Sequence, residues 1–231
     1  MRSTVNLLGP LAGPWAKLKK GWLLYHLAND NYRFMFEPPP PDEWVCLDCE
    51  TTGLDRRRDE IVSVGAVRIV GSRVLTSERL ELLVRPEKRA LSAEAVKVHR
   101  LREQDVAQGI APEAAMAQLM RFIGSRPLVG YYLEFDVAML NRVIWPMLGL
   151  RLPQPKIEVS ALYYDWKNRQ LPAHERGNRN IDLSFATMMA DLELPLYEAH
   201  DATNDAVMTA LAFVKLRALL GQDRVVSGAT I

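Results

Sequence analysis

The chain has 231 residues, of which 48% are apolar and 25% charged, and its 29 basic residues nearly balance 28 acidic ones. This composition is typical of a soluble globular protein with room for one α/β domain and an appendage. It excludes a disulfide framework, because Cys46 and Cys49 are the two cysteines, and no apolar run is long enough to span a bilayer. We therefore expect a cytoplasmic protein, whose near-neutral charge neither indicates nor excludes nucleic-acid binding.

Residues 1–41 are predicted to form an N-terminal extension. Aromatic and apolar residues recur at helical spacing between Trp15 and Tyr25, and four prolines follow at positions 38–41. Proline lacks an N–H donor and favours extended backbone, so this run predicts a stiff linker. The helix of residues 1–36 either packs on the main domain or binds a protein partner or a membrane surface.

The main domain is expected from residue 42 to residue 222, with a short tail at 223–231. Its first three strands are joined by connections too short for crossover helices, so we expect them to pair antiparallel. Helices then alternate with one further strand, and Ser92 is the expected N-cap of the first helix. This order predicts an α/β fold with a mixed sheet flanked by helices. The predicted strands are 44–47, 61–70, 75–84 and 128–130, and the predicted helices are 92–99, 112–123, 135–147, 182–192 and 202–220.

The segment VCLDCETTGLD, residues 45–55, places two acids on one strand. Residues two apart on a strand point to the same face, so Asp48 and Glu50 project together. Adjacent carboxylates repel unless a positive charge lies between them, and a hard divalent cation with oxygen ligands supplies one. Cys46 and Cys49 point to opposite faces by the same rule, so they are not expected to bridge or to bind zinc.

Two more acids come early in predicted helices. Asp136 follows the strand 128–130 and lies in the first turn of the next helix, where the helix dipole favours an acid, so a purely capping role is equally consistent. Asp205 lies in the early part of the last helix, and His200 precedes that helix.

Together these segments resemble the three motifs of the DnaQ-like, or DEDDh, 3′–5′ exonuclease family, which includes the DNA polymerase III epsilon-type proofreading exonucleases. The first motif, D-x-E-T-T-G-L, is intact at residues 48–54, and the third, H-x-A-x-x-D, at residues 200–205. The second commonly reads H-N-x-x-F-D. Here Phe135 and Asp136 are kept, but Tyr131 and Tyr132 replace the His-Asn pair, which changes how the terminal nucleotide is held.

The resemblance implies a ribonuclease H-like sheet and two bound divalent cations, Mg²⁺ with Mn²⁺ as a substitute. The implied ligands are Asp48, Glu50, Asp136 and Asp205. His200 is the implied general base, because an imidazole with an ordinary pKa of about 6.5 suits proton transfer near neutrality. The residues expected to approach the 3′-terminal nucleotide are Thr51, Thr52, Gly53, Leu54, His99, Tyr131, Tyr132 and Phe135.

The function implied is release of nucleoside 5′-monophosphates from the 3′ end of single-stranded or frayed DNA. Three alternatives share these motifs: an RNA-trimming exonuclease, a non-catalytic exonuclease-like binding module, and a proofreading subunit bound to a polymerase. A non-catalytic module has no need for four clustered acids. Polymerase attachment in this family commonly uses an extension after the exonuclease domain, whereas the spare residues here precede it.

Overall fold

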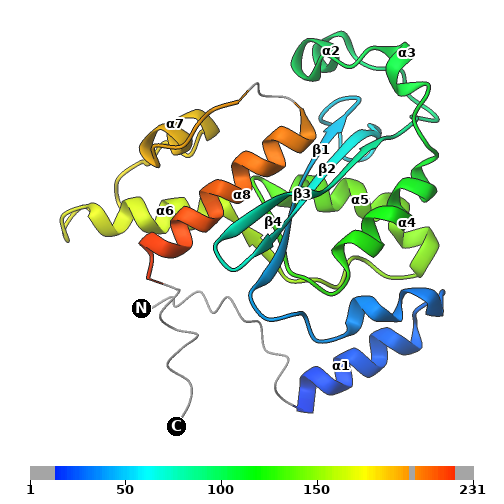
Figure 1. The fold of residues 1–231 in the computed structure, drawn as a ribbon, viewed down its shortest axis with the longest axis horizontal. Helices are drawn as coiled ribbons and strands as arrows, with labels where there is room; N and C mark the ends of the chain where they lie inside the picture. The colour runs from blue at the N-terminus through cyan, green and yellow to red at the C-terminus, as the bar shows by residue number, and fades with distance from the viewer. Residues whose placement is uncertain (1–13, 198–200, 222–231) are drawn as a thin grey trace.

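A computed structural model describes residues 14–197 and 201–221 and shows a five-stranded mixed sheet with helices on both faces (Figure 1). The strand order is β3-β2-β1-β4-β5. This arrangement confirms the predicted mixed sheet flanked by helices. The strands are β1 (Glu43–Thr51), β2 (Ile61–Val70), β3 (Arg73–Leu83), β4 (Leu128–Gly130) and β5 (Lys156–Glu158).

The sheet has an antiparallel half and a parallel half. β1, β2 and β3 pair antiparallel, as predicted, because tight connections join them. β4 runs parallel to β1, and β5 runs parallel to β4. The carboxyl ends of β1, β4 and β5 therefore meet at one edge, which is where ligands bind in many parallel α/β sheets.

Local signals set most helix boundaries. The Ser92 side chain accepts a hydrogen bond from the Ala95 amide at the start of α2, and Pro112 opens α4, which ends at Gly124. Within residues 14–197 and 201–221, no helix is long and apolar enough to cross a membrane. The helices are α1 (Pro14–Tyr25), the 3₁₀ helix η1 (Asp30–Phe36), α2 (Ala93–His99), α3 (Glu103–Val106), α4 (Pro112–Ile123), α5 (Leu133–Leu148), α6 (Val159–Gln170), α7 (Phe185–Asp191) and α8 (Ala202–Leu219).

Each face of the sheet carries its own apolar core. Helices α4 and α5 cover one face, and α6, α7 and α8 cover the other (Figure 1). β1 supplies both cores by alternation: Val45, Leu47 and Cys49 join the first, while Cys46 joins the second. The cysteines are free and buried on opposite faces, as predicted.

The segment after α1 packs into the core of the α4–α5 face. The backbone amide of Ala28 donates to the carbonyl of Leu148 at 2.8 Å, which ties this segment to the end of α5. The packing interpretation of the N-terminal extension therefore fits residues 27–36, although residues 1–13 lie outside the described ranges. The buried side chains contributed here are Leu27, Tyr32, Met35 and Phe36.

Helix α8 lies in close contact with β2. Gly65 pairs with Asp48 across the β1–β2 ladder, and a Cβ at position 65 would come 2.2 Å from the carbonyl carbon of Ala202. Such a distance is far below van der Waals contact, so the first turn of α8 can rest on β2 only because residue 65 is glycine. This contact brings the start of α8 beside Asp48.

Candidate active site

Three carboxylates meet between β1 and α8. Asp48 and Glu50 leave the carboxyl end of β1 on the face that α8 covers, and Asp205 lies in the first turn of α8. One oxygen from each residue lies within 4.8 Å of the others, and all three side chains are partly buried. The predicted alternation along β1 therefore places Asp48 and Glu50 together.

Asp136 lies beside this cluster but outside it. It is buried in the first turn of α5, which lies on the other face of the sheet. Its negative charge is the strongest of the neighbouring charges that raise the pKa of Asp48. The backbone amides of Cys49 and Asp136 hydrogen-bond to its carboxylate. Asp136 thus adds a fourth acid next to the three.

Burial and mutual repulsion raise the pKa values of Asp48, Glu50 and Asp136. Burial, then the charges of Asp136 and Glu50, raises the pKa of Asp48 well above its ordinary value. Burial, then the charges of Asp205 and Asp201, raises the pKa of Glu50 to about 7. Burial, then the charge of Glu50, raises the pKa of Asp136. A divalent cation relieves this repulsion by displacing protons.

The loop after β1 continues the site. The Thr51 hydroxyl donates to the carbonyl of Gly53 at 2.6 Å, and the buried Thr52 hydroxyl donates to a carboxylate oxygen of Asp59 at 3.1 Å. A Cβ at position 53 would come 2.6 Å from another oxygen of Asp59, so glycine allows this tight turn. Leu54 is 86% exposed at the tip.

On a strand, Tyr131 and Tyr132 would face opposite ways, but the two tyrosines do not lie on a strand. β4 ends at Gly130, and Tyr132 adopts a left-handed conformation as the N-cap of α5. Their rings lie side by side, with centroids 4.5 Å apart. The Tyr131 hydroxyl donates to the carbonyl of Leu183 and its ring packs on Phe185, whereas Tyr132 is 58% exposed.

The remaining predicted site residues are His200, His99 and Phe135. His200, the expected general base, lies outside the described residues. His99 is buried at the end of α2, where its Nδ1 accepts from the Leu101 amide at 3.1 Å. Phe135 is partly buried and packs on the core of the α4–α5 face. The contacts described for His99 and Phe135 are therefore packing and backbone contacts at α2 and α5.

Glu158 is a site residue that the sequence did not reveal. It ends β5, and its two carboxylate oxygens accept hydrogen bonds from the backbone amides of Tyr132 and Leu133 at 3.0 and 2.9 Å. It also caps α6 by accepting from Ser160. Glu158 therefore fixes the start of α5, three residues before Asp136. Glutamate is an unusual N-cap residue, so the sequence pattern did not indicate this role of Glu158.

Comparison with known proteins places this chain in a family. The sequence profile of the exonuclease family RNase T matches residues 45–213. The DNA polymerase III PolC-type protein of Thermotoga maritima is 26% identical over 172 residues, covering 74% of this chain and 12% of that protein. DNA polymerase III subunit epsilon of Aquifex aeolicus is 23% identical, covering 75% of this chain and 79% of the subunit.

A solved structure shares the fold. Exonuclease X in complex with 5′ overhanging duplex DNA superposes with a TM-score of 0.59 at 22% identity, covering 77% of this chain and 93% of that one. The chain belongs to the exonuclease family, and its sheet is the predicted ribonuclease H-like one. It spans only about an eighth of the PolC-type relatives.

Proposed function

We propose that this chain is a metal-dependent 3′–5′ exonuclease that releases nucleoside 5′-monophosphates from the 3′ end of single-stranded or frayed DNA. The observation that carries the proposal is the three-carboxylate cluster of Asp48, Glu50 and Asp205 in a fold of the exonuclease family. Hydrolysis of a phosphodiester requires charge stabilisation at both the attacking and the leaving oxygen, and such a cluster suits the cations that provide it.

The donor set fits hard divalent cations. All three ligands are carboxylates, their oxygens lie within 4.8 Å of one another, and the pKa values of Asp48 and Glu50 are raised. Oxygen ligands suit Mg²⁺ and Mn²⁺, whereas zinc favours nitrogen and sulfur. Bound cations would activate a water nucleophile and neutralise charge on the phosphate. Two cations are proposed, with Asp136 as the fourth ligand.

The other residues hold the strand and move the proton. We assign His200 as the acceptor of the proton from the attacking water, because it directly precedes Asp201 and α8 in the third motif. The turn of Thr51, Thr52 and Gly53 lies next to Glu50 and offers backbone groups to the terminal nucleotide. The exposed ring of Tyr132 is suited to stack on a base without reading its identity.

DNA is the proposed substrate because the relatives are DNA polymerase III proteins and exonuclease X was solved with DNA. The test uses matched DNA and RNA strands carrying a label at either end, incubated with Mg²⁺, Mn²⁺ or EDTA. We expect a 3′ label to be released at once as a mononucleotide, and a 5′-labelled strand to shorten one nucleotide at a time. Release from the 5′ end, or undiminished cleavage in EDTA, would contradict the proposal. Faster RNA cleavage would select the RNA-trimming alternative.

A further inference from the structure

The loop between β1 and β2 carries a run of basic side chains beside the acidic cluster. Arg56, Arg57 and Arg58 are all exposed. Thr52 and Glu60 pair across the base of this loop, where the Thr52 amide donates to the carbonyl of Glu60 at 2.8 Å. Because Thr52 is two residues from Glu50, the base of this loop adjoins the end of β1 that carries the acids, and the three exposed arginines follow within the loop.

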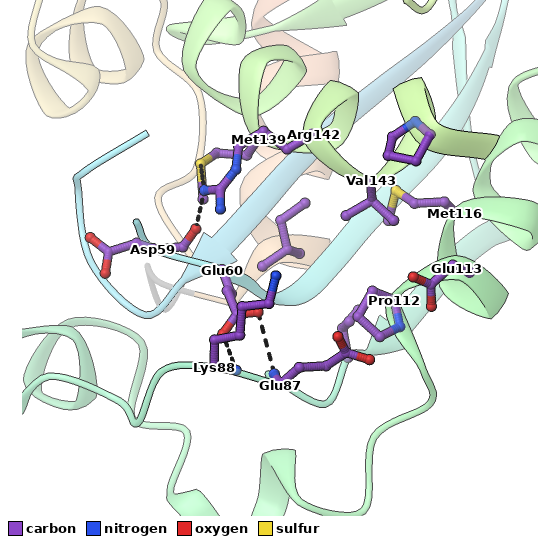
Figure 2. A pocket seen from close by; sticks show the side chains of 13 residues that line it. Asp59, Glu60, Glu87, Lys88, Pro112, Glu113, Met116, Met139, Arg142 and Val143 are labelled. Carbon is purple, nitrogen blue, oxygen red and sulfur yellow. Dashed lines mark hydrogen bonds between the residues drawn. The ribbon is translucent and has the colours of Figure 1, made fainter. Parts of the chain in front are cut away.

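Side-chain contacts fix the backbone of this loop from inside. The Asp59 carboxylate accepts from the Thr52 hydroxyl and from the Asp55 amide at 3.1 and 2.8 Å. From α5, the Arg142 guanidinium donates to the carbonyls of Arg56 and Asp59. Figure 2 shows Arg142 reaching Asp59 at the pocket beside the loop. The three arginines are thus presented on a fixed backbone.

A second basic segment is tied to the same loop. Both oxygens of the Glu60 carboxylate are used: they accept from the backbone amides of Glu87, Lys88 and Arg89 at 3.3, 2.7 and 2.8 Å. Figure 2 shows Glu60 pointing at this segment. The side chains of Lys88 and Arg89 are exposed. We call the five cations of the two segments the basic rim: Arg56, Arg57, Arg58, Lys88 and Arg89.

The charges of the basic rim are available to a ligand. Within the described ranges, the one ion pair made by these five side chains joins Arg58 to Asp55 at 3.8 Å, and both partners are exposed. An exposed pair of this kind contributes little to stability and is easily exchanged. Nothing in the packing of the fold therefore accounts for three consecutive arginines at this position.

The acidic site gives a physical reason for cationic side chains in the neighbouring loops. Asp48, Glu50, Asp136 and Asp205, with Asp201 and Glu158 nearby, gather negative charge at the edge of the sheet. A nucleic-acid strand is itself a polyanion and is repelled by the part of this charge that protons and bound cations do not neutralise. Cationic side chains around the cluster offset the repulsion and attract the strand. The nearly neutral total charge of the chain hides this separation of acidic centre and basic rim.

We infer that the basic rim binds the phosphates of the substrate strand on the 5′ side of the nucleotide being removed. The inference rests on the proposed nuclease function and names the part of the substrate beyond the catalytic centre. Its contribution is to affinity for long strands and to the salt dependence of binding. A substrate with no phosphate beyond the reacting one cannot use it.

The test compares the triple variant Arg56→Gln/Arg57→Gln/Arg58→Gln with the wild-type protein. We expect KM for a ten-nucleotide single strand to rise about tenfold near physiological salt, with kcat little changed. The dependence of log(kcat/KM) on log salt should become shallower by about 2, since each lost phosphate contact removes about 0.7 for a single strand. The loss of kcat/KM should become smaller as the strand is shortened. It should be smallest on p-nitrophenyl thymidine 5′-monophosphate.

A control variant separates local contact from total charge. Lys19→Gln/Lys20→Gln/Arg33→Gln removes the same charge from the N-terminal segment, which lies at the opposite end of the sheet (Figure 1). An equal KM rise in this control, an equal loss on the small ester, or an unchanged KM in the rim variant would each overturn the inference.

A binding measurement keeps the inference independent of catalysis. Anisotropy of a labelled ten-nucleotide strand in Ca²⁺ reports affinity without hydrolysis. If the wild-type protein binds the strand and the rim variant binds it about tenfold more weakly, the basic rim is supported even where no cleavage is seen. In that case only the proposed nuclease function fails. Equal affinity of both proteins overturns the rim.

Discussion

Single acids of the carboxylate cluster are expected to have opposite effects on stability and on activity. Asp48 and Asp205 repel their neighbours in the metal-free protein, yet both are proposed metal ligands. We expect Asp48→Ala and Asp205→Ala to abolish nuclease activity while the melting temperature in EDTA stays the same or rises. Activity assays and thermal melts of the same preparations measure both effects.

An acid outside the cluster serves as the control for those two variants. Asp30 is exposed in η1 and forms an ion pair with the exposed Arg33 at 3.0 Å. Asp30→Ala should keep wild-type turnover and a similar melting temperature. Near-wild-type turnover in purified Asp48→Ala or Asp205→Ala would remove these residues from the proposed metal site.

The raised pKa of Glu50 predicts how stability depends on pH. The folded protein holds the Glu50 proton up to about pH 7, whereas the unfolded chain releases it near 4.5. The stabilising contribution is therefore complete below the lower value and is lost as pH rises through about 7. In EDTA, Glu50→Gln should be more stable than wild type by about 1–3 kcal/mol at pH 8 and equally stable near pH 4.5.

Urea unfolding at several pH values measures this difference directly. Added Mg²⁺ should stabilise the wild-type protein at pH 8 and reduce the advantage of the variant, because the cation replaces the proton. A stability difference that stays constant from pH 4.5 to pH 8 would show that Glu50 does not carry a raised pKa.

Strand alternation was enough to predict the pair of acids on β1, because the direction of a side chain on a strand follows from its position in the sequence. The proximity of Asp205 to Asp48 and Glu50 was predicted only through the family motif. Its distance from Asp48 depends on how closely α8 packs on β2, which involves contacts between residues far apart in the chain. Glu158 was missed for the same reason: its partners, Tyr132 and Leu133, lie 25 or more residues away.

At the scale of the elements, the position of the first turn of α5 depends on a contact with the end of β5. Glu158 accepts two backbone amides at the start of α5 with one oxygen each. In Glu158→Gln one acceptor becomes a donor and faces an N–H group, so the first turn of α5 and Asp136 should shift. We expect activity to fall about tenfold, with a higher Mn²⁺ concentration needed for half-maximal rate and a nearly unchanged KM for the strand.

Glu134→Gln is the matched control, because Glu134 is exposed in the same turn of α5. It should leave both rate and Mn²⁺ dependence near wild type. If Glu158→Gln loses stability but keeps the wild-type Mn²⁺ dependence, Glu158 acts on folding alone and does not position Asp136.

Elements with strong patterns were predicted well, whereas the strand β5 and the helix α6 were not predicted. The strand 61–70 and the helix 112–123 agree with the structure, because alternation, Pro112 and Gly124 mark them. β5 has three residues, and α6 begins with an unusual glutamate cap. β4 ends at Gly130, as predicted, but the left-handed conformation of residue 132 was not predicted, because a tyrosine gives no sign of it in the sequence.

At the scale of the whole molecule, residues 27–36, which precede the proline run, contribute to the stability of the fold. A protein starting at Asp42 loses Tyr32, Met35 and Phe36 from the core of the α4–α5 face. We expect its free energy of unfolding to fall by roughly 4–9 kcal/mol, since each of these three buried side chains contributes about 1.5–3 kcal/mol. A protein starting at Leu27 keeps these residues and should be much closer to wild type.

Urea midpoints of the two shortened proteins and the full chain measure this. Equal midpoints for all three would mean that residues 27–36 add nothing to the fold. The metal site itself should survive in any folded shortened protein, because its ligands on β1 and α8 lie after Asp42.

The absence of a side chain at Gly65 has a consequence for which ion would suit the proposed metal site. A methyl group there would push the start of α8 away from β2 by roughly 1 Å to restore van der Waals contact, and Asp205 would move with it. Mg²⁺ tolerates such widening poorly, because it demands short, near-octahedral coordination, whereas larger ions accept longer bonds. Gly65→Ala should therefore raise the ratio of the Mn²⁺-supported to the Mg²⁺-supported rate, so that the ionic radius preferred by this nuclease is set by a residue that touches no ion.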